Sequence, residues 1–225
     1  MGCTGHCGGT DPVQLCEDYL IFMTRLLLFE EAVEESAPQT RFGGRPLVPA
    51  QEKFNWPVCK GCDNALQFLG QFTVAGNKIP KIISLFMCNY DGACSTWEAD
   101  GGANRAFIFL MSNLELAEPP ASKVQTLRGT KHGAGIVEYE GDYDQARSAW
   151  AKAQGVRARM VLGQWLGEPS WIQADETPTC HCGKKMTMVA QLEEGPDAHT
   201  AMNFGGGCGY LFWCEDHQAK FLWQQ

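Results

Sequence analysis

The sequence predicts an α+β protein, rich in β-sheet, with two related β units, an N-terminal helix and a short connecting helix. Three observations support this prediction. Apolar residues with helical spacing cover residues 12–35, short β-like runs begin at residue 41, and a weak internal repeat relates residues 41–111 to residues 164–225. The 225 residues are enough to bury a sizeable core.

The first predicted element is a helix that begins at Asp11 and Pro12, an N-cap residue followed by a residue suited to a first turn. Apolar residues then recur at steps of three and four: Leu15, Tyr19, Phe22, Met23, Leu26, Phe29 and Val33. Residues 12–35 contain six acidic residues and one basic residue, Arg25. Residues 1–40 are therefore predicted to be a Gly-rich tail and an acidic amphipathic helix, whose acidic side is either a solvated face or a docking surface.

Residues 41–225 are predicted to form a single domain, made of repeat 41–111, connector 112–163 and repeat 164–225. Runs at 66–74, 82–88 and 106–111 are typical of strands, because Gly, Pro and Asn separate them. In the connector, residues 133–139 are compatible with a strand. Residues 142–154, which end at Gly155, predict a helix with Tyr143, Ala146, Trp150 and Ala153 on one side.

The internal repeat is carried by short motifs at offsets of 120 to 126 residues. The matches are Gly44-x-Pro46 with Gly167-x-Pro169, Pro57-x-Cys59 with Pro178-x-Cys180, Gln71 with Gln191, and Leu85-Phe86-Met87-Cys88 with Leu211-Phe212-Trp213-Cys214. Two β units that share one core follow from this pattern. The residues predicted to be buried are Leu66, Phe68, Leu85, Phe86, Met186, Met188, Leu211 and Phe212.

Cysteines occupy matching places in the two units, a pair before one strand and a further Cys after a later strand, as in zinc knuckles. The first predicted site is a four-sulfur zinc site of Cys59, Cys62, Cys88 and Cys94. The second combines Cys180, Cys182 and Cys214 with His217, because Lys220 aligns with Cys94. Both are predicted to be structural, since a closed site leaves the metal no open position for chemistry.

Alternatives to this ligand set remain open. Cys208 and His181 compete for the second site, and Cys3, His6, Cys7 and Cys16 form a possible further site. Free cysteines also occur simply as small buried apolar residues.

Charge and composition restrict the class of protein. Lys and Arg number 18 against 26 Asp and Glu, which gives a formal charge of −8. Phosphate binding needs a basic surface, so nucleic acid is not expected as a partner, whereas a basic protein is. No membrane-spanning run and no signal peptide are found, so a cytoplasmic location is predicted. Disulfides cannot explain eleven cysteines in such a compartment, which favours metal binding.

Several motifs resemble the bacterial YwqG-like family: GGRP at 43–46, PVCKGC at 57–62, LQFLGQ at 66–71, GEPSWIQ at 167–173 and NFGG at 203–206. The resemblance covers about residues 40–225 and implies a duplicated, sheet-rich body without an established enzymatic activity. The paired cysteines also look like those of the distantly similar programmed cell death protein 2 family, which implies zinc binding and a chaperone role toward a basic ribosomal protein. The one-residue spacer of Cys180-x-Cys182 departs from the usual spacing.

These observations lead to two functional hypotheses. The first is a non-enzymatic, zinc-stabilised protein-binding module, a chaperone or immunity-type partner of a basic protein. The alternative is an enzyme whose site is assembled from scattered residues such as Asp100, Asn104, Arg105 and His132. The sequence contains no nucleophile elbow, zinc-protease motif or phosphate-binding loop, which favours the first hypothesis.

Overall fold

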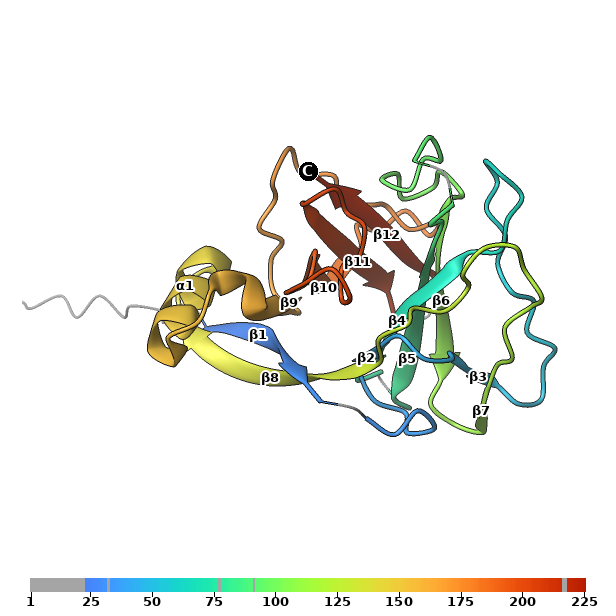
Figure 1. Ribbon diagram of the computed structural model, residues 1–225, viewed down its shortest axis with the longest axis horizontal. Coiled ribbons are helices and arrows are strands. Elements are labelled where there is room, and N and C mark those ends of the chain that lie inside the picture. Colours follow the sequence, from blue (N-terminus) through green and yellow to red (C-terminus); the bar gives the residue numbers. More distant parts are fainter. Residues whose placement is uncertain (1–22, 32, 77, 91, 216–217) are drawn as a thin grey trace, which may run out of the picture.

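The computed structural model describes residues 23–31, 33–76, 78–90, 92–215 and 218–225, which are dominated by one curled antiparallel sheet (Figure 1). Its ten strands lie in the order β12-β11-β10-β9-β1-β8-β2-β4-β5-β6. Their bounds are β1 (Met23–Glu30), β2 (Arg41–Phe42), β4 (Gln67–Val74), β5 (Lys81–Met87), β6 (Asn104–Leu110), β8 (His132–Glu140), β9 (Val161–Trp165), β10 (Thr187–Glu193), β11 (Cys208–Cys214) and β12 (Gln218–Gln224). A separate ribbon pairs β3 (Leu47–Pro49) with β7 (Leu114–Leu116).

The sheet curls until its two edges nearly meet, which makes it barrel-like. Contacts between β12 and the loop that precedes β6 hold the edges together. The Trp223 N–H donates to the Trp97 carbonyl at 3.4 Å, and Lys220 Nζ lies 2.7 Å from Asp100 Oδ2. Near closure protects the outer strands, whose backbone groups would otherwise offer an edge for pairing with other chains.

The predicted α+β class is wrong, because strands make up 39% of the structure and helix only 8%. The predicted N-terminal helix is the main error. Residues 23–30, which were to be its central part, form β1, and residues 12–22 lie outside the described part of the chain. The α-helix that the structure describes is α1 (Tyr143–Gln154), followed by a 3₁₀ turn at Ala158–Met160.

Tertiary pairing explains why this stretch is a strand. Strand β1 lies between β8 and β9, so that Leu27 faces Ile136 on one side and Gly163 on the other. In this position the backbone N–H and C=O groups of β1 form hydrogen bonds with strands on both sides. These hydrogen bonds outweigh the helix propensity of Leu, Arg and Glu. Leu26 and Leu27 are fully buried, whereas Met23 is 48% exposed. Burial therefore does not follow the helical stripe, since Met23 and Phe29 on the stripe are exposed while Leu27, which is not on it, is buried.

The connecting helix is confirmed with its predicted ends. Asp142 caps α1 by accepting from the Gln145 N–H, and Gly155 ends the helix in the left-handed conformation. Tyr143 and Ala146 are buried and pack with Leu26 and Val161. The apolar side differs in one place from the prediction, because Ala153 is exposed and Ala151 is buried instead.

All eight residues predicted to be buried are buried: Leu66, Phe68, Leu85, Phe86, Met186, Met188, Leu211 and Phe212. One core unites both halves of the chain, since Leu85 belongs to the same cluster as Leu192, Leu211 and Phe221. Alternate residues of β4 and β5, such as Phe68 and Phe86, pack instead on the opposite face beside the first cysteine group. The cysteine group thus lies against a second, smaller core.

Equivalent hydrogen bonds recur in the two halves. Gln71 Oε1 accepts from the Leu47 N–H at 3.3 Å, and Gln191 Oε1 accepts from the Ser170 N–H at 2.8 Å. These glutamines fix the segments that follow the two Gly-x-Pro motifs. Shared ancestry of the halves and the division into repeat, connector and repeat stay predictions, which superposition of the halves can test.

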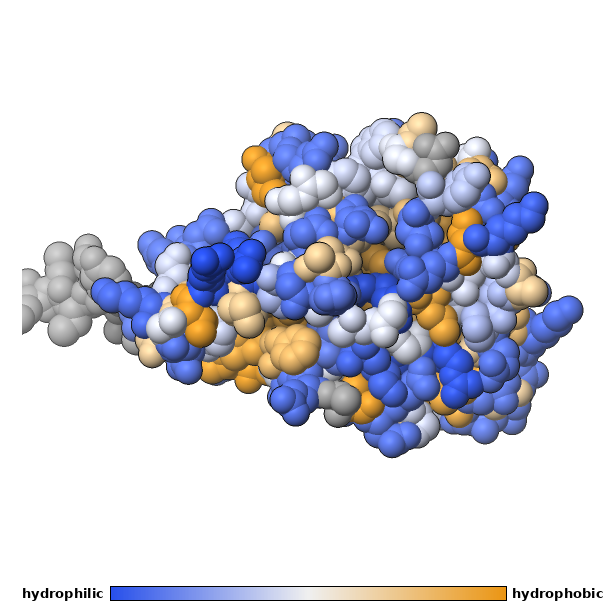
Figure 2. All heavy atoms as spheres, in the orientation of Figure 1, coloured by the Kyte–Doolittle hydropathy of each residue, from blue (hydrophilic) through white to orange (hydrophobic). Residues whose placement is uncertain are grey.

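The surface is mainly hydrophilic on the face shown in Figure 2, with apolar residues gathered over the region of β8 and α1. Within the described ranges, no helix has the length and apolar character needed to cross a membrane.

Candidate metal centres

The first cysteine group begins in a tight turn before β4. The Cys59 N–H donates to the Asn64 carbonyl at 2.8 Å, and the Leu66 N–H donates to the Pro57 carbonyl at 2.9 Å. Asp63 has a φ of 57°, a conformation that Asp tolerates better than most residues. This turn places the thiols of Cys59 and Cys62 on the same side.

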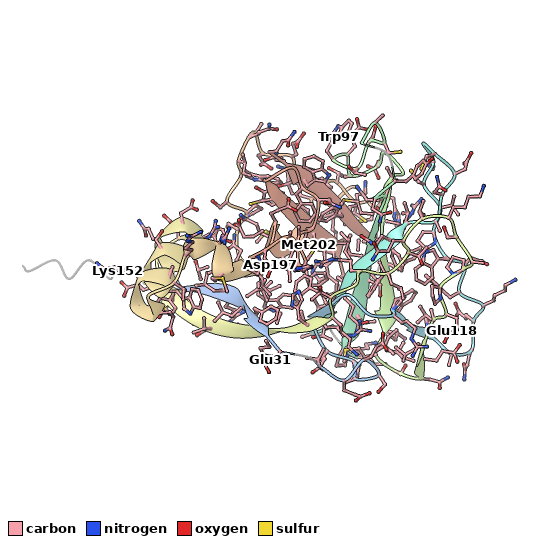
Figure 3. The ribbon with its side chains drawn as sticks, in the orientation of Figure 1. Glu31, Trp97, Glu118, Lys152, Asp197 and Met202 are labelled. Carbon is pink, nitrogen blue, oxygen red and sulfur yellow. The ribbon has the colours of Figure 1, made fainter. Side chains whose placement is uncertain are left out.

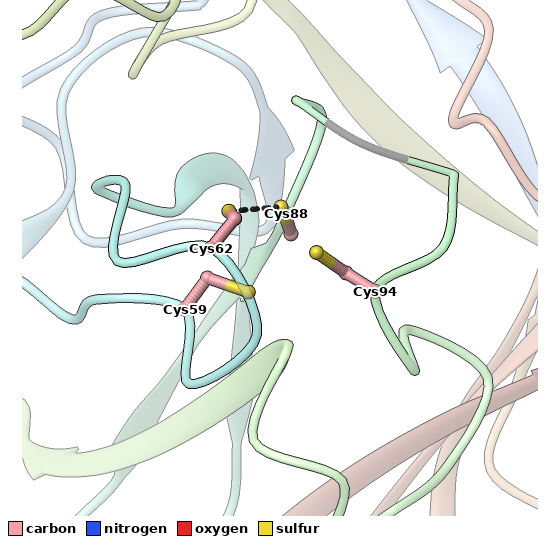
Figure 4. A group of neighbouring side chains, drawn as sticks. All are labelled: Cys59, Cys62, Cys88 and Cys94. Atoms are coloured by element: carbon pink, nitrogen blue, oxygen red, sulfur yellow. Dashed lines mark hydrogen bonds between the residues drawn. The ribbon is translucent and has the colours of Figure 1, made fainter.

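Cys88 and Cys94 complete the group from the other end of the hairpin. Cys88 directly follows β5, where its N–H donates to the Ala103 carbonyl at 2.8 Å, and Cys94 lies in the loop before β6. Figure 4 shows the four side chains converging. Their sulfur atoms all lie within 4.8 Å of one another. The structure thus brings together all four residues of the first predicted site.

The sulfur geometry fits a tetrahedral zinc ion. Sulfurs at about 2.3 Å from zinc lie about 3.8 Å apart along each edge of the tetrahedron. The Cys62 and Cys88 sulfurs are 3.6 Å apart, close to this distance and far above a disulfide bond length. Cys59, Cys88 and Cys94 are buried and Cys62 is half-buried, which suits a structural ion screened from water.

The environment favours a cation among these thiols. Burial raises the pKa of the Cys62 thiol, but hydrogen bonds from Asn64, Cys88 and Cys59 outweigh burial and lower that pKa to about 7. Burial and the three neighbouring cysteines raise the pKa of Cys94 instead. One thiol therefore ionises easily while another resists ionisation until a cation compensates the charge, so metal binding should release protons.

The second cysteine group repeats the first in its backbone. The Cys180 N–H donates to the Lys184 carbonyl and the Met186 N–H to the Pro178 carbonyl, each at 2.9 Å. Cys214 is the last residue of β11, and its sulfur lies 3.6 Å from that of Cys182. The sulfurs of Cys180, Cys182 and Cys214 lie within 4.8 Å of one another. The shorter spacer therefore still brings three sulfurs together.

The second group has three sulfurs among the described residues, so a tetrahedral site there needs a fourth ligand besides these. Predicted ligand His217 lies outside the described residues. The rival Cys208 does not belong to the cluster, because it begins β11, whereas Cys214 ends that strand. The Cys208 thiol contacts Glu193 Oε1 at 3.5 Å. The rival His181 has Nδ1 at 3.9 Å from the Cys180 sulfur without belonging to the cluster of three.

The second group is more open than the first, since Cys180 is buried but Cys182 is exposed. A hydrogen bond from the Lys184 backbone, with contributions from Cys180 and Cys214, lowers the pKa of Cys182. Burial and the neighbouring Cys182 and Cys180 raise the pKa of Cys214 to about 12. The possible further ligands Cys3, His6, Cys7 and Cys16 lie outside the described residues.

The four residues of the enzyme hypothesis lie in different structural settings. Asp100 pairs with Lys220, and the buried Asn104 amide donates to the carbonyls of Thr96 and Glu98. Arg105 is an exposed residue of β6. His132 is buried in β8, where its ring stacks 4.9 Å from that of Phe42. The described residues therefore give this hypothesis no assembled site.

Asn64 is a contributor that the sequence prediction missed. Its amide donates to the Cys62 carbonyl at 3.1 Å, while its own carbonyl accepts from the Cys59 N–H. An Asp-Asn pair directly after a Cys-x-x-Cys motif is the signal that points to such a turn-fixing residue.

No known family model matches the chain, and no curated protein matches it either. The resemblance to the YwqG-like family therefore depends on the short motifs and stays a prediction.

Proposed function

We propose that this protein is a zinc-stabilised module that binds a basic partner protein, as a chaperone or an immunity protein does. The observation that carries the proposal is the gathering of the sulfurs of Cys59, Cys62, Cys88 and Cys94 within 4.8 Å of one another. A buried four-sulfur set is typical of structural zinc and has no position for a substrate. The metal would then stabilise the fold rather than carry out chemistry.

The charge of the chain supports a basic partner. The formal charge is −8, and zinc centres of four thiolates and of three thiolates with one histidine make it about −11. Such a charge attracts basic proteins and speeds their association at low ionic strength. The motif resemblance supports the same proposal.

Elemental analysis tests the metal part of the proposal. Protein purified without added metal should hold at least one zinc ion per chain, and two if the second group also binds. Cys59→Ser should lose about one equivalent, whereas Cys208→Ser, which changes a cysteine outside both groups, should keep the full content. Less than half an equivalent in the unmodified protein would contradict the proposal.

Affinity capture from native lysate, followed by mass spectrometry, tests the partner. We expect one basic protein in stoichiometric amount, released by salt because charge attraction is screened. Recovery of acidic proteins alone, or recovery of the same proteins with an unrelated acidic bait, would contradict the proposal of a specific basic partner.

A further inference from the structure

A groove of about 670 Å³ lies between the segment before the first cysteine pair and the ribbon of β3 and β7. Its walls include Phe54, Trp56 and the carboxylates of Glu52, Glu115 and Glu118. A smaller hollow of about 320 Å³ shares Glu52 and continues along β6. Figure 3 places Glu118 on the side of the molecule where β3 and β7 lie. The two hollows therefore adjoin at Glu52.

The aromatic part of the groove is held rigidly. Trp56 Nε1 donates to the Leu66 carbonyl at 2.8 Å, and its ring packs against that of Phe86 at 5.3 Å. Phe54 packs against Phe107 at 5.6 Å. Trp56 and Phe54 remain half-buried, so part of each ring is free. With the indole N–H already used, the free surface offers π faces, which suit the stems and cationic heads of Lys and Arg.

The rim of the groove is acidic. Glu52, Glu115 and Glu118 are exposed, and Lys53 is the cation among the described residues that line it. Glu118 pairs with Arg45. In the described part of the chain, no cationic group lies within ion-pair distance of Glu52 or Glu115. Two carboxylates are therefore available to cations from outside.

The first cysteine group fixes the groove in place. Trp56 lies three residues before Cys59, and its partner Phe86 lies two residues before Cys88. Phe54 and Trp56 pack against the cluster that contains these cysteines. A zinc ion bound there would stabilise the aromatic wall.

From these observations we propose that this groove binds an extended basic segment of a partner protein, with cationic side chains over Trp56 and Phe54 and their charges at Glu52 and Glu115. The inference rests on the proposed function and names the surface that it uses. Charge complementarity selects the occupant, because apolar or acidic segments would leave these carboxylates unpaired.

Fluorescence anisotropy with labelled deca-lysine tests the proposal on the full-length, zinc-loaded protein. Glu52→Gln with Glu115→Gln should weaken binding by about fivefold or more, the effect of two exposed charge contacts. The matched control, Glu140→Gln with Glu168→Gln, removes two exposed carboxylates elsewhere and should change affinity less than twofold. In NMR spectra, deca-lysine should shift the indole N–H signal of Trp56 and not that of Trp150.

The outcomes separate the groove from the broader function. If both double variants weaken binding equally, or if the Trp56 signal does not move, the proposal for the groove is overturned, while the proposal of a basic partner still stands. If the unmodified protein does not bind deca-lysine at all, both proposals fail.

Discussion

Cys59 is fully buried and is the first cysteine of the better enclosed sulfur group. In the proposed zinc centre, replacing this sulfur would remove one of four ligands and leave three thiolates close together. Cys59→Ser should therefore destabilise the protein by on the order of 3 kcal/mol or more, lowering the melting temperature by about 6–12 °C. Thermal melts followed by circular dichroism measure this.

Cys208→Ser is the matched control for that substitution. Cys208 is also buried, but it contacts Glu193 and belongs to neither sulfur group, so its loss should cost about 1 kcal/mol. Equal destabilisation by the two substitutions would mean that Cys59 acts only by packing.

His132 makes stability depend on pH. Burial lowers the pKa of His132, with an opposing hydrogen bond to Gly133 and a further lowering by Arg128. The neutral ring lies between Phe29 and Phe42, and its Nε2 has no partner among the described groups. The folded state disfavours the protonated ring. The contribution of neutral His132 to the free energy of unfolding is therefore complete above the unfolded pKa of about 6.5, and it is lost as the pH falls below that value.

Urea unfolding between about pH 7.5 and about pH 5.5 measures this dependence, which reaches at most about 1.4 kcal/mol per pH unit for one proton. His132→Gln should flatten the profile, whereas His199→Gln at an exposed site should leave it unchanged. Metal loss at low pH affects all variants alike, so the difference between variants isolates His132. Parallel profiles for His132→Gln and the unmodified protein would show that the ring is protonated without penalty.

At the scale of elements, β1 is the strand that joins the two halves of the sheet. Leu27 is fully buried in the central core, whereas Met23 at the start of the strand is 48% exposed. Leu27→Ala should lower the free energy of unfolding by about 3 kcal/mol, the typical cost of a cavity at a buried leucine. Met23→Ala should change it by less than about 0.5 kcal/mol.

Chemical denaturation of the two variants provides the comparison. In the helical pattern, Met23 lies on the apolar stripe and Leu27 does not, so a helix would make Met23 the more sensitive position. The reverse order of effects would therefore contradict the strand.

For the molecule as a whole, the cysteine groups lie at the ends of β5 and β11, against clusters distinct from the central core. Zinc removal by a strong chelator should therefore lower the melting temperature by 10 °C or more, on the order expected for loss of structural ions. Added zinc should restore the original value. The control is the same chelator saturated with zinc, and an unchanged melting temperature in the free chelator would show that the fold does not depend on metal.

Local sequence signals determined much of this molecule. The cap residues Asp142 and Gly155 fix α1, and the spacing of Cys59 and Cys62 fixes a turn that places their two sulfurs close together. Short apolar runs bounded by Gly, Pro and Asn predicted β4 and β5 and several of their buried side chains. These features depend on neighbours within a few residues, so local physical chemistry predicts them.

Tertiary structure alone decided the remainder. Leu26 and Leu27 suit a helix locally, but the open position between β8 and β9 makes residues 23–30 a strand, and only the folded sheet provides that position. Trp56 and Glu115, which are distant in the sequence, likewise line one groove. From the sequence, Cys208 and Cys214 are both candidate ligands, but in the structure they lie at opposite ends of β11. Long-range pairing sets these positions, and no local pattern encodes the partner.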